Sequence, residues 1–248
     1  MYNNTAHKGM VVALSLTLLI FCCYYTAAEA MELYQTMDDI VYKADVIFLG
    51  KVTNMECRYG PNQKMIFTDV SFEVENLIYR NEKTQPIEKD IMLTFAGGEI
   101  GGEIVEVSDV PSFEIGATYL IFTRMDGKTY ASPVIGGFQG LFKVVTDTAT
   151  GTPYPLTYGG NCIVGAGNKK IITGPRVNGI FKGRIQQMPG SAPDRFYAVA
   201  PEPAKGWERS GARAAVSKAG RELPGKVIPL PELLTAIQDR LNARKEGR

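Results

Sequence analysis

The chain has 248 residues, and its 27 lysines and arginines nearly balance its 26 acids, which leaves a formal net charge of +1. Proteins that hold nucleic acid through its phosphates are normally strongly basic, so this balance argues against nucleic acid as a partner. The length suits one sizeable domain with an appendage.

The first thirty residues have the pattern of a secretory signal peptide. Lys8 precedes an apolar run from Met10 to Cys23, and Ala28 and Ala30 occupy the −3 and −1 positions of a cleavage site. An uncleaved anchor helix would need about 20 apolar residues, more than this run supplies. We therefore expect residues 1–30 to be removed and the protein to be secreted or periplasmic. Its membrane contact would be limited to this peptide before cleavage.

Cleavage would also remove His7, the only histidine of the chain. A mature chain without histidine excludes Ser or Cys hydrolases that use a histidine base, and zinc sites with histidine ligands. A pair of catalytic carboxylates, as in glycosidases, is not excluded, because it needs only two acids. We therefore expect no cofactor, and the sequence favours a protein that is not an enzyme.

Two cysteines, Cys57 and Cys162, remain after cleavage. An oxidising compartment permits a disulfide between them. Two separate thiols are the alternative, and the sequence leaves both open.

A helix is predicted at the start of the mature chain, within residues 32–46. Its apolar residues fall on one helical face: Leu33, Met37, Ile40, Val41 and Ala44. The apolar period then changes to two, which is typical of strands. Strands are predicted at residues 46–53, 68–76, 90–95, 103–107, 118–124, 128–135 and 141–145. Because short turns join most of them, we expect a mainly β fold, a small antiparallel OB-like barrel of about six to eight strands.

Beyond Thr146 the strand pattern weakens. Residues 146–155 are predicted to form a loop, and residues 161–174 could hold one more strand pair. Residues 176–228 are rich in Pro, Gly, Ala, Ser and charged residues. Such a composition is typical of an irregular, flexible linker.

A C-terminal amphipathic helix is predicted at residues 229–248. Its apolar stripe is formed by Leu230, Leu233, Leu234, Ile237 and Leu241. Arg244 and Lys245 lie at its end, where cations suit the helix dipole. The apolar face could dock on the barrel, or bind a partner or a membrane surface. The chain thus divides into a signal peptide (1–30), a barrel domain (31–175), a linker (176–228) and this helix (229–248).

The segment GGEIGGEI, at residues 97–104, has glycines in a spacing that could serve a ligand. A dinucleotide fingerprint needs G-x-G-x-x-G before a helix, whereas this segment leads into a predicted strand. Calcium prefers oxygen ligands, so Glu99, Glu103 and Asp109 are weak metal candidates, but their spacing matches no calcium loop. The favoured interpretation is a bulge or corner where a strand bends to close the barrel.

An aromatic cluster follows in PVIGGFQGLFKVV, where Phe138 and Phe142 alternate with glycines. Exposed aromatic rings would provide a stacking platform for a polymer. We favour the alternative, in which the rings fill the core and the glycines relieve crowding at a bend.

Four segments in this order resemble a family of exported bacterial proteins of unknown function. They are DIVYKADVIFLGKVT, TDVSFEVENLIYRN, GGEIGGEIVEVSDVPSFEIGATYLIF and GGFQGLFKVVTDTATG. Some members of that family carry a matrixin-type zinc protease downstream, but this chain has no H-E-x-x-H motif. More remotely, the chain is similar to the netrin and tissue-inhibitor-of-metalloprotease modules, which are OB-type barrels. Those inhibitors chelate zinc through an N-terminal cysteine, whereas the mature chain would start at Met31.

Together these features predict an exported, non-catalytic interaction module that binds an extracytoplasmic protein or a surface polymer. The alternative is a carboxylate- or calcium-dependent hydrolase of the envelope. A concave cluster of acids would favour the enzyme, and exposed, solvated acids would favour binding.

Overall fold

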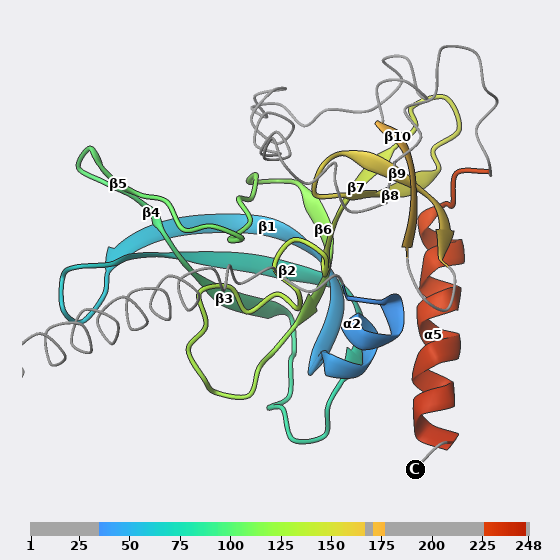
Figure 1. The fold of residues 1–248 in the computed structure, drawn as a ribbon, viewed down its shortest axis with the longest axis horizontal. Helices are drawn as coiled ribbons and strands as arrows, with labels where there is room; N and C mark the ends of the chain where they lie inside the picture. The colour runs from blue at the N-terminus through green and yellow to red at the C-terminus, as the bar shows by residue number, and fades with distance from the viewer. Residues whose placement is uncertain (1–34, 167–170, 177–225, 247–248) are drawn as a thin grey trace, which may run out of the picture. The chain divides into compact units, whose positions relative to one another are not determined.

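The computed structural model describes residues 35–166, 171–176 and 226–246, and these form a large antiparallel sheet, a small hairpin and two helices (Figure 1). The predicted signal peptide and nearly all of the predicted linker lie outside the described residues. Neither of the two described helices has the length and apolar character that a membrane crossing requires.

The large sheet has eight strands in the order β10-β9-β8-β7-β6-β1-β2-β3, and β4 pairs with β5 apart from it. In chain order the elements are α2 (Met37–Lys43), β1 (Val46–Tyr59), β2 (Ile66–Arg80), β3 (Asp90–Ala96), β4 (Gly98–Ile100), β5 (Glu103–Val105), β6 (Thr118–Thr123), β7 (Leu141–Thr146), β8 (Pro153–Thr157), β9 (Asn161–Ala166), β10 (Ile171–Arg176) and α5 (Leu230–Glu246). The prediction of a mainly β, antiparallel protein with a helix at each end is confirmed.

The prediction of a closed barrel is wrong, because the sheet is open. Within the described residues β3 and β10 are its two edges, and each pairs with one neighbour. Closure would need a later strand to return to β3, but β7, β8, β9 and β10 are instead added one after another on the far side of β6. A loop also covers part of β3, since the Ala96 amide donates to the Ala131 carbonyl.

The N-terminal helix is shorter than predicted. The Thr36 hydroxyl accepts a hydrogen bond from the Asp39 amide, and the Asp39 carboxylate accepts one from the Thr36 amide, a reciprocal capping box. Ala44 at the other end is extended, so α2 ends at Lys43, and only two residues separate it from β1.

β1 and β2 form a hairpin much longer than predicted. At its base Val46, Ile47 and Phe48 are all buried, so both faces of β1 are covered there. Toward the turn most side chains of β1 are exposed, and Tyr59 pairs with Ile66 at the last position. The outer part of β1 is therefore largely exposed, whereas Ile66 of β2, opposite Tyr59, is buried.

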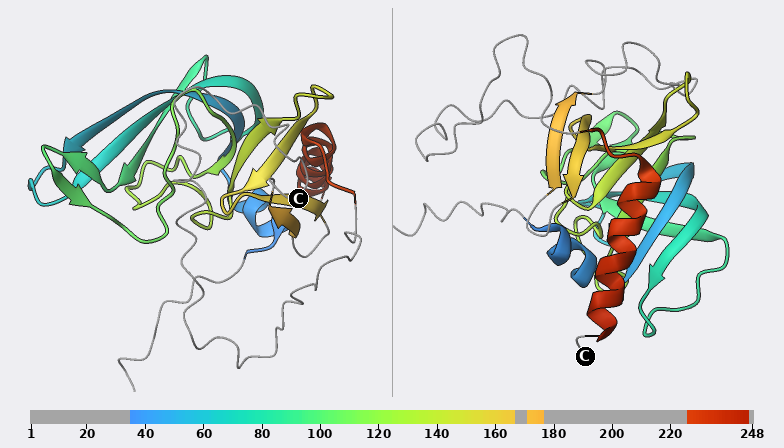
Figure 2. Two further views of the ribbon diagram at one scale, coloured as in Figure 1. Left: turned by 90° about the horizontal axis from the view of Figure 1, so that it is seen from above. Right: turned by 90° about the vertical axis from the view of Figure 1, so that its right-hand side faces the viewer.

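Two hydrophobic clusters lie on opposite faces of the sheet. The first joins α2 and α5 to the sheet and includes Met37, Ile40, Ile47, Leu120, Phe122, Phe142, Leu233 and Ile237. The second has Phe113 at its centre, with ring centroids 5.4 Å from Phe72, 4.8 Å from Phe95 and 5.3 Å from Tyr119. Such offset and edge-on contacts are favourable for aromatic rings. Figure 2 shows α5 lying along one side of the sheet beside α2.

Two predictions after β6 are wrong, one of a strand and one of a loop. Residues 128–135 form no strand, and only an isolated bridge joins Thr123 to Val134. Conversely, the predicted loop at residues 146–155 contains the start of β8. Pro153 and Pro155 lack an amide hydrogen, and their strand meets β9 at a single pair, Leu156 with Cys162. The predicted strand pair within residues 161–174 is confirmed as β9 and β10.

The C-terminal helix docks through the predicted stripe. Leu230, Leu233, Ile237 and Leu241 are buried against the first cluster. Arg240 adds polar contacts on the same side, because its Nε lies 2.7 Å from Asp38 Oδ1 and its Nη2 donates to the Ala166 carbonyl at 3.0 Å. The helix is thereby held to α2 and to the end of β9.

Candidate functional site

The segment GGEIGGEI forms a separate hairpin rather than a corner in a barrel wall. Gly101 and Gly102 have φ of 60° and 88°, which a two-residue turn between β4 and β5 requires. The hairpin is tied to the outer part of the β1–β2 hairpin. The Gly97 amide donates to the Ile66 carbonyl at 2.7 Å, and the Thr68 hydroxyl donates to the Gly97 carbonyl at 2.7 Å.

Gly98 permits the closest approach in this region. A Cβ at this position would lie 2.6 Å from Thr68 Oγ1 and 2.8 Å from Cys57 Sγ, and φ is 138°. A side chain there would clash and would be strained as well. The glycine therefore lets β4 rest directly on β1 and β2.

The three weak metal candidates do not converge. Glu99, Glu103 and Asp109 are all exposed, and Glu103 instead accepts a hydrogen bond from the Tyr59 hydroxyl at 3.2 Å. That bond raises the pKa of Tyr59. In the part of the chain that the structure describes, no group of three or more His, Cys, Asp or Glu side chains could hold a metal ion.

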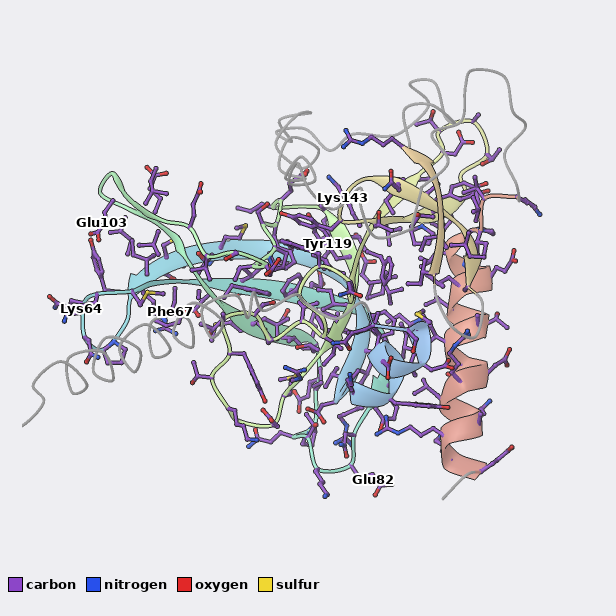
Figure 3. The ribbon with its side chains drawn as sticks, in the orientation of Figure 1. Lys64, Phe67, Glu82, Glu103, Tyr119 and Lys143 are labelled. Carbon is purple, nitrogen blue, oxygen red and sulfur yellow. The ribbon has the colours of Figure 1, made fainter. Side chains whose placement is uncertain are left out.

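Large apolar side chains are exposed where the two hairpins end. Tyr59 is 41% exposed, Met65 39% and Ile104 63%. We call this surface the hairpin end. Figure 3 shows Glu103 at the same end of the molecule as Lys64 and Phe67, far from Glu82, which follows the other end of β2.

A polar network braces the outer side of the hairpin. Arg58 Nε lies 2.6 Å from Asp69 Oδ2, and the Thr94 hydroxyl donates to Asp69 Oδ1 at 2.6 Å, which joins β1, β2 and β3. The guanidinium of Arg58 also lies over the Phe67 ring, 5.6 Å from its centroid. Burial acts to raise the pKa of Asp69, but the hydrogen bonds from Arg58 and Thr94 outweigh it and the pKa is lowered.

The two cysteines are free thiols in the structure and lie in separate places. Cys57 is half-buried in β1, with its sulfur 3.4 Å from the Thr68 hydroxyl. Cys162 is fully buried in β9 with Val145 and Leu156. Burial raises the pKa of the Cys162 thiol to about 11, so this thiol is protonated and unreactive near neutral pH.

The two phenylalanines of the aromatic cluster have different surroundings. Phe142 is buried and meets Phe122 edge-on at 6.0 Å. Phe138 is half-buried and stacks on Tyr158, with centroids 4.3 Å apart and planes 14° apart. The core interpretation therefore holds for Phe142, whereas Phe138 belongs to a stacked pair at the surface.

A largely buried ion pair fastens the loop before β6 to β7. Lys143 Nζ lies 2.7 Å from Glu114 Oε1, and the Glu114 amide donates to the Tyr119 hydroxyl at 3.1 Å. Figure 3 shows Lys143 and Tyr119 close together in the middle of the sheet. No local pattern indicates this pair, because Lys143 lies in an apolar strand and its partner is in a loop.

A cavity of about 640 Å³ lies where β2 ends against the last turns of α5. Its walls are residues 78–83 on one side, and Leu241, Arg244 and Lys245 on the other. Four cationic side chains line it, Arg80, Lys83, Arg244 and Lys245, against one carboxylate, Glu82. We call it the cationic pocket. The pocket is not predictable from local sequence, because its two walls are far apart in the chain and the helix dipole alone explains Arg244 and Lys245.

Comparison with protein-family models, with curated proteins and with solved structures finds no match to this chain. The described residues thus offer an apolar, acid-rimmed hairpin end and a cationic pocket.

Proposed function

We propose that the chain is an exported, non-catalytic interaction module that binds a protein partner through the hairpin end. The observation that carries the proposal is the exposure of Tyr59, Met65 and Ile104 near the ends of two hairpins that the hydrogen bond from Tyr59 to Glu103 joins. Contiguous exposed apolar surface is uncommon in soluble proteins and often marks an interaction site.

The surroundings of these side chains are those of a protein interface. Glu99, Glu103, Arg58 and Lys64 are exposed nearby, and a polar rim around an apolar centre is typical of such interfaces. The surface is also well braced, since Gly98 and the Asp69 network fix the two hairpins to each other and to the sheet. A rigid surface loses less conformational entropy on binding.

Export and the resemblance to the exported bacterial family remain part of the proposal and rest on the sequence. An OB-like origin for the sheet is a further part. The meander β1-β2-β3, with β6 returning to the free side of β1 and β7 next to it, is the arrangement that an OB-like barrel would have if it were left open.

The test compares Ile104→Asp with Met92→Asp. Ile104 is 63% exposed at the hairpin end and Met92 is 62% exposed in the middle of β3, so the two substitutions differ mainly in place. The full chain, carrying a photo-crosslinker at position 59 or 65, is exposed to envelope extract of the source organism. We expect a crosslinked protein that Ile104→Asp reduces by about tenfold or more and Met92→Asp leaves unchanged.

Equal capture by both variants would contradict the assignment of the hairpin end. Turnover of an envelope polymer by the purified chain would contradict the non-catalytic role and favour the carboxylate- or calcium-dependent hydrolase. In that case, chelation of calcium or substitution of acids outside the hairpin end should abolish the turnover.

A further inference from the structure

The cationic pocket lies at the end of β2 opposite to the hairpin end, and its lining residues differ from those of the hairpin end. We propose that it binds a ligand carrying two or more phosphate groups. Its volume of about 640 Å³ falls in the range of small-ligand sites. Its lining combines four cations with the apolar side chains of Ile78 and Leu241.

Arg244 is fixed in place without an anion. Its guanidinium lies 5.4 Å from the ring centroid of Tyr79 and 6.0 Å from that of Tyr42. Its Nη1 is buried and has no hydrogen-bond acceptor among the described residues. Stacking on two rings orients the guanidinium, and a buried donor without an acceptor is costly. The side chain is therefore preorganised, and one of its donors is unsatisfied among the described residues.

Arg240, one turn earlier on the same helix, provides an internal contrast. It is satisfied by the Asp38 carboxylate and by the carbonyls of Ala236 and Ala166. Among the described residues none of the four pocket cations forms such an ion pair with a carboxylate. Among the described residues the pocket cations thus lack the kind of ion pair that Asp38 of α2 forms with Arg240.

The opposite wall is also held in shape. Arg80 Nη1 donates to the Thr84 carbonyl, the Thr84 amide donates to the Asn81 carbonyl at 2.9 Å, and the Asn81 amide donates to the Asp45 carbonyl at 2.7 Å. These bonds fix the loop that carries Lys83. Two walls from distant parts of the chain therefore present cations to one space.

The number and kind of cations favour phosphates. One carboxylate is satisfied by a single arginine in a bidentate pair, whereas the pocket has two arginines and two lysines. A phosphate offers three acceptor oxygens in different directions, and lysine binds it as a point charge while arginine binds it as a planar fork. The helix dipole explains cations at positions 244 and 245, but it does not explain Arg80 and Lys83 on the other wall.

The test measures the binding of sodium tripolyphosphate to the full chain by titration calorimetry. Lys83 and Lys245 are exposed, so the double variant Lys83→Gln/Lys245→Gln should fold normally. Its matched control is Lys128→Gln/Lys226→Gln, which removes the same charge from exposed lysines elsewhere. We expect the pocket variant to weaken binding by about tenfold or more, and the control to change it by less than about twofold.

Three results would overturn the proposal. The first is no binding of tripolyphosphate by the unchanged chain at about millimolar concentration. The second is an equal loss in the control, which would indicate attraction by net charge alone. The third is citrate binding as tightly as tripolyphosphate, which would remove the preference for phosphate.

A second arm identifies where the phosphates come from. Phosphatidylcholine vesicles, with and without cardiolipin, whose headgroup carries two phosphates, are sedimented with the chain and with the pocket variant. Binding to the anionic vesicles that the pocket variant loses would support the proposal with lipid headgroups as the source. Binding of tripolyphosphate without vesicle binding would support it with a soluble phosphate polymer or ester. Failure of crosslinking at the hairpin end would contradict the proposed function but would not change the interpretation of either phosphate-binding result.

Discussion

The two ends of the long hairpin are stabilised by different forces. At the base, α5 is held mainly by apolar side chains such as Leu233 and Ile237, which are fully buried against the sheet. At the hairpin end, the small hairpin is held by a glycine contact at Gly98 and by hydrogen bonds to Gly97. Burial of apolar area contributes more per residue than such hydrogen bonds do.

This difference separates stability from binding within one sheet. The base contains the residues on which folding depends, and the cationic pocket is built there from a rigid loop and a docked helix. The hairpin end adds little to the core, so its side chains can be exposed for a partner. Substitutions at the two ends should therefore lower the free energy of unfolding by unequal amounts.

The largest effect is expected from Leu233→Ala, which removes a fully buried side chain from α5. Loss of the buried atoms and the cavity left behind should lower the free energy of unfolding by about 3 kcal/mol. Ile104→Ala, at an exposed position of the hairpin end, should lower it by less than about 0.5 kcal/mol. Urea unfolding followed by circular dichroism measures both. Similar losses in the two variants would show that the ends are not stabilised as differently as we argue.

A smaller effect is expected from Gly98→Ala. The added methyl group would meet Thr68 and Cys57 at a positive φ, so β4 should lift from β1 and β2 at a cost of roughly 2 kcal/mol. Gly101→Asn is the control, because its Cβ would meet nothing within 4 Å and asparagine tolerates positive φ. Hydrogen exchange at the Gly97 amide reports the change. Unchanged protection in Gly98→Ala would mean that the close approach does not hold the small hairpin.

Local patterns in the sequence were sufficient for the elements at the base. The stripe from Leu230 to Leu241 and the alternation in β2 each lie within one segment, so their period predicts them. The double glycine of GGEIGGEI is equally local, but it was interpreted as a corner because the partner of the turn was not known. The two-residue spacing between Ile100 and Glu103 is the signal that could have identified a hairpin.

Features that join distant segments could not be predicted in this way. Barrel closure depends on which strand returns to β3, and no residue of β3 specifies that choice. β8 was missed because its prolines argue against a strand, although pairing with β7 overrides them. The cationic pocket needs Lys83 and Arg244 to meet, which only the docking of α5 brings about.

The smallest effect, and the one that depends on pH, is expected from Asp69→Asn. Asp69 accepts hydrogen bonds from Arg58 and Thr94, and its pKa lies below the ordinary value of 3.8. A carboxyl group with a lowered pKa in the folded state stabilises the protein above its unfolded pKa, and that contribution is lost as the pH falls through the folded pKa. At pH 7 the variant should be less stable by under about 1 kcal/mol, because the ion pair is partly exposed.

The difference between the two chains should shrink below about pH 4, where Asp69 of the unfolded chain begins to bind a proton, and should go on shrinking until Asp69 of the folded chain is protonated as well. Free energies of unfolding, measured in urea from pH 7 down to pH 3, test this course. Asp109→Asn, at an exposed carboxyl group, is the control and should follow the unchanged chain throughout. A difference between Asp69→Asn and the unchanged chain that is constant across this range would show that the network acts through shape rather than charge. The hairpin end would then be braced by packing, as the base is.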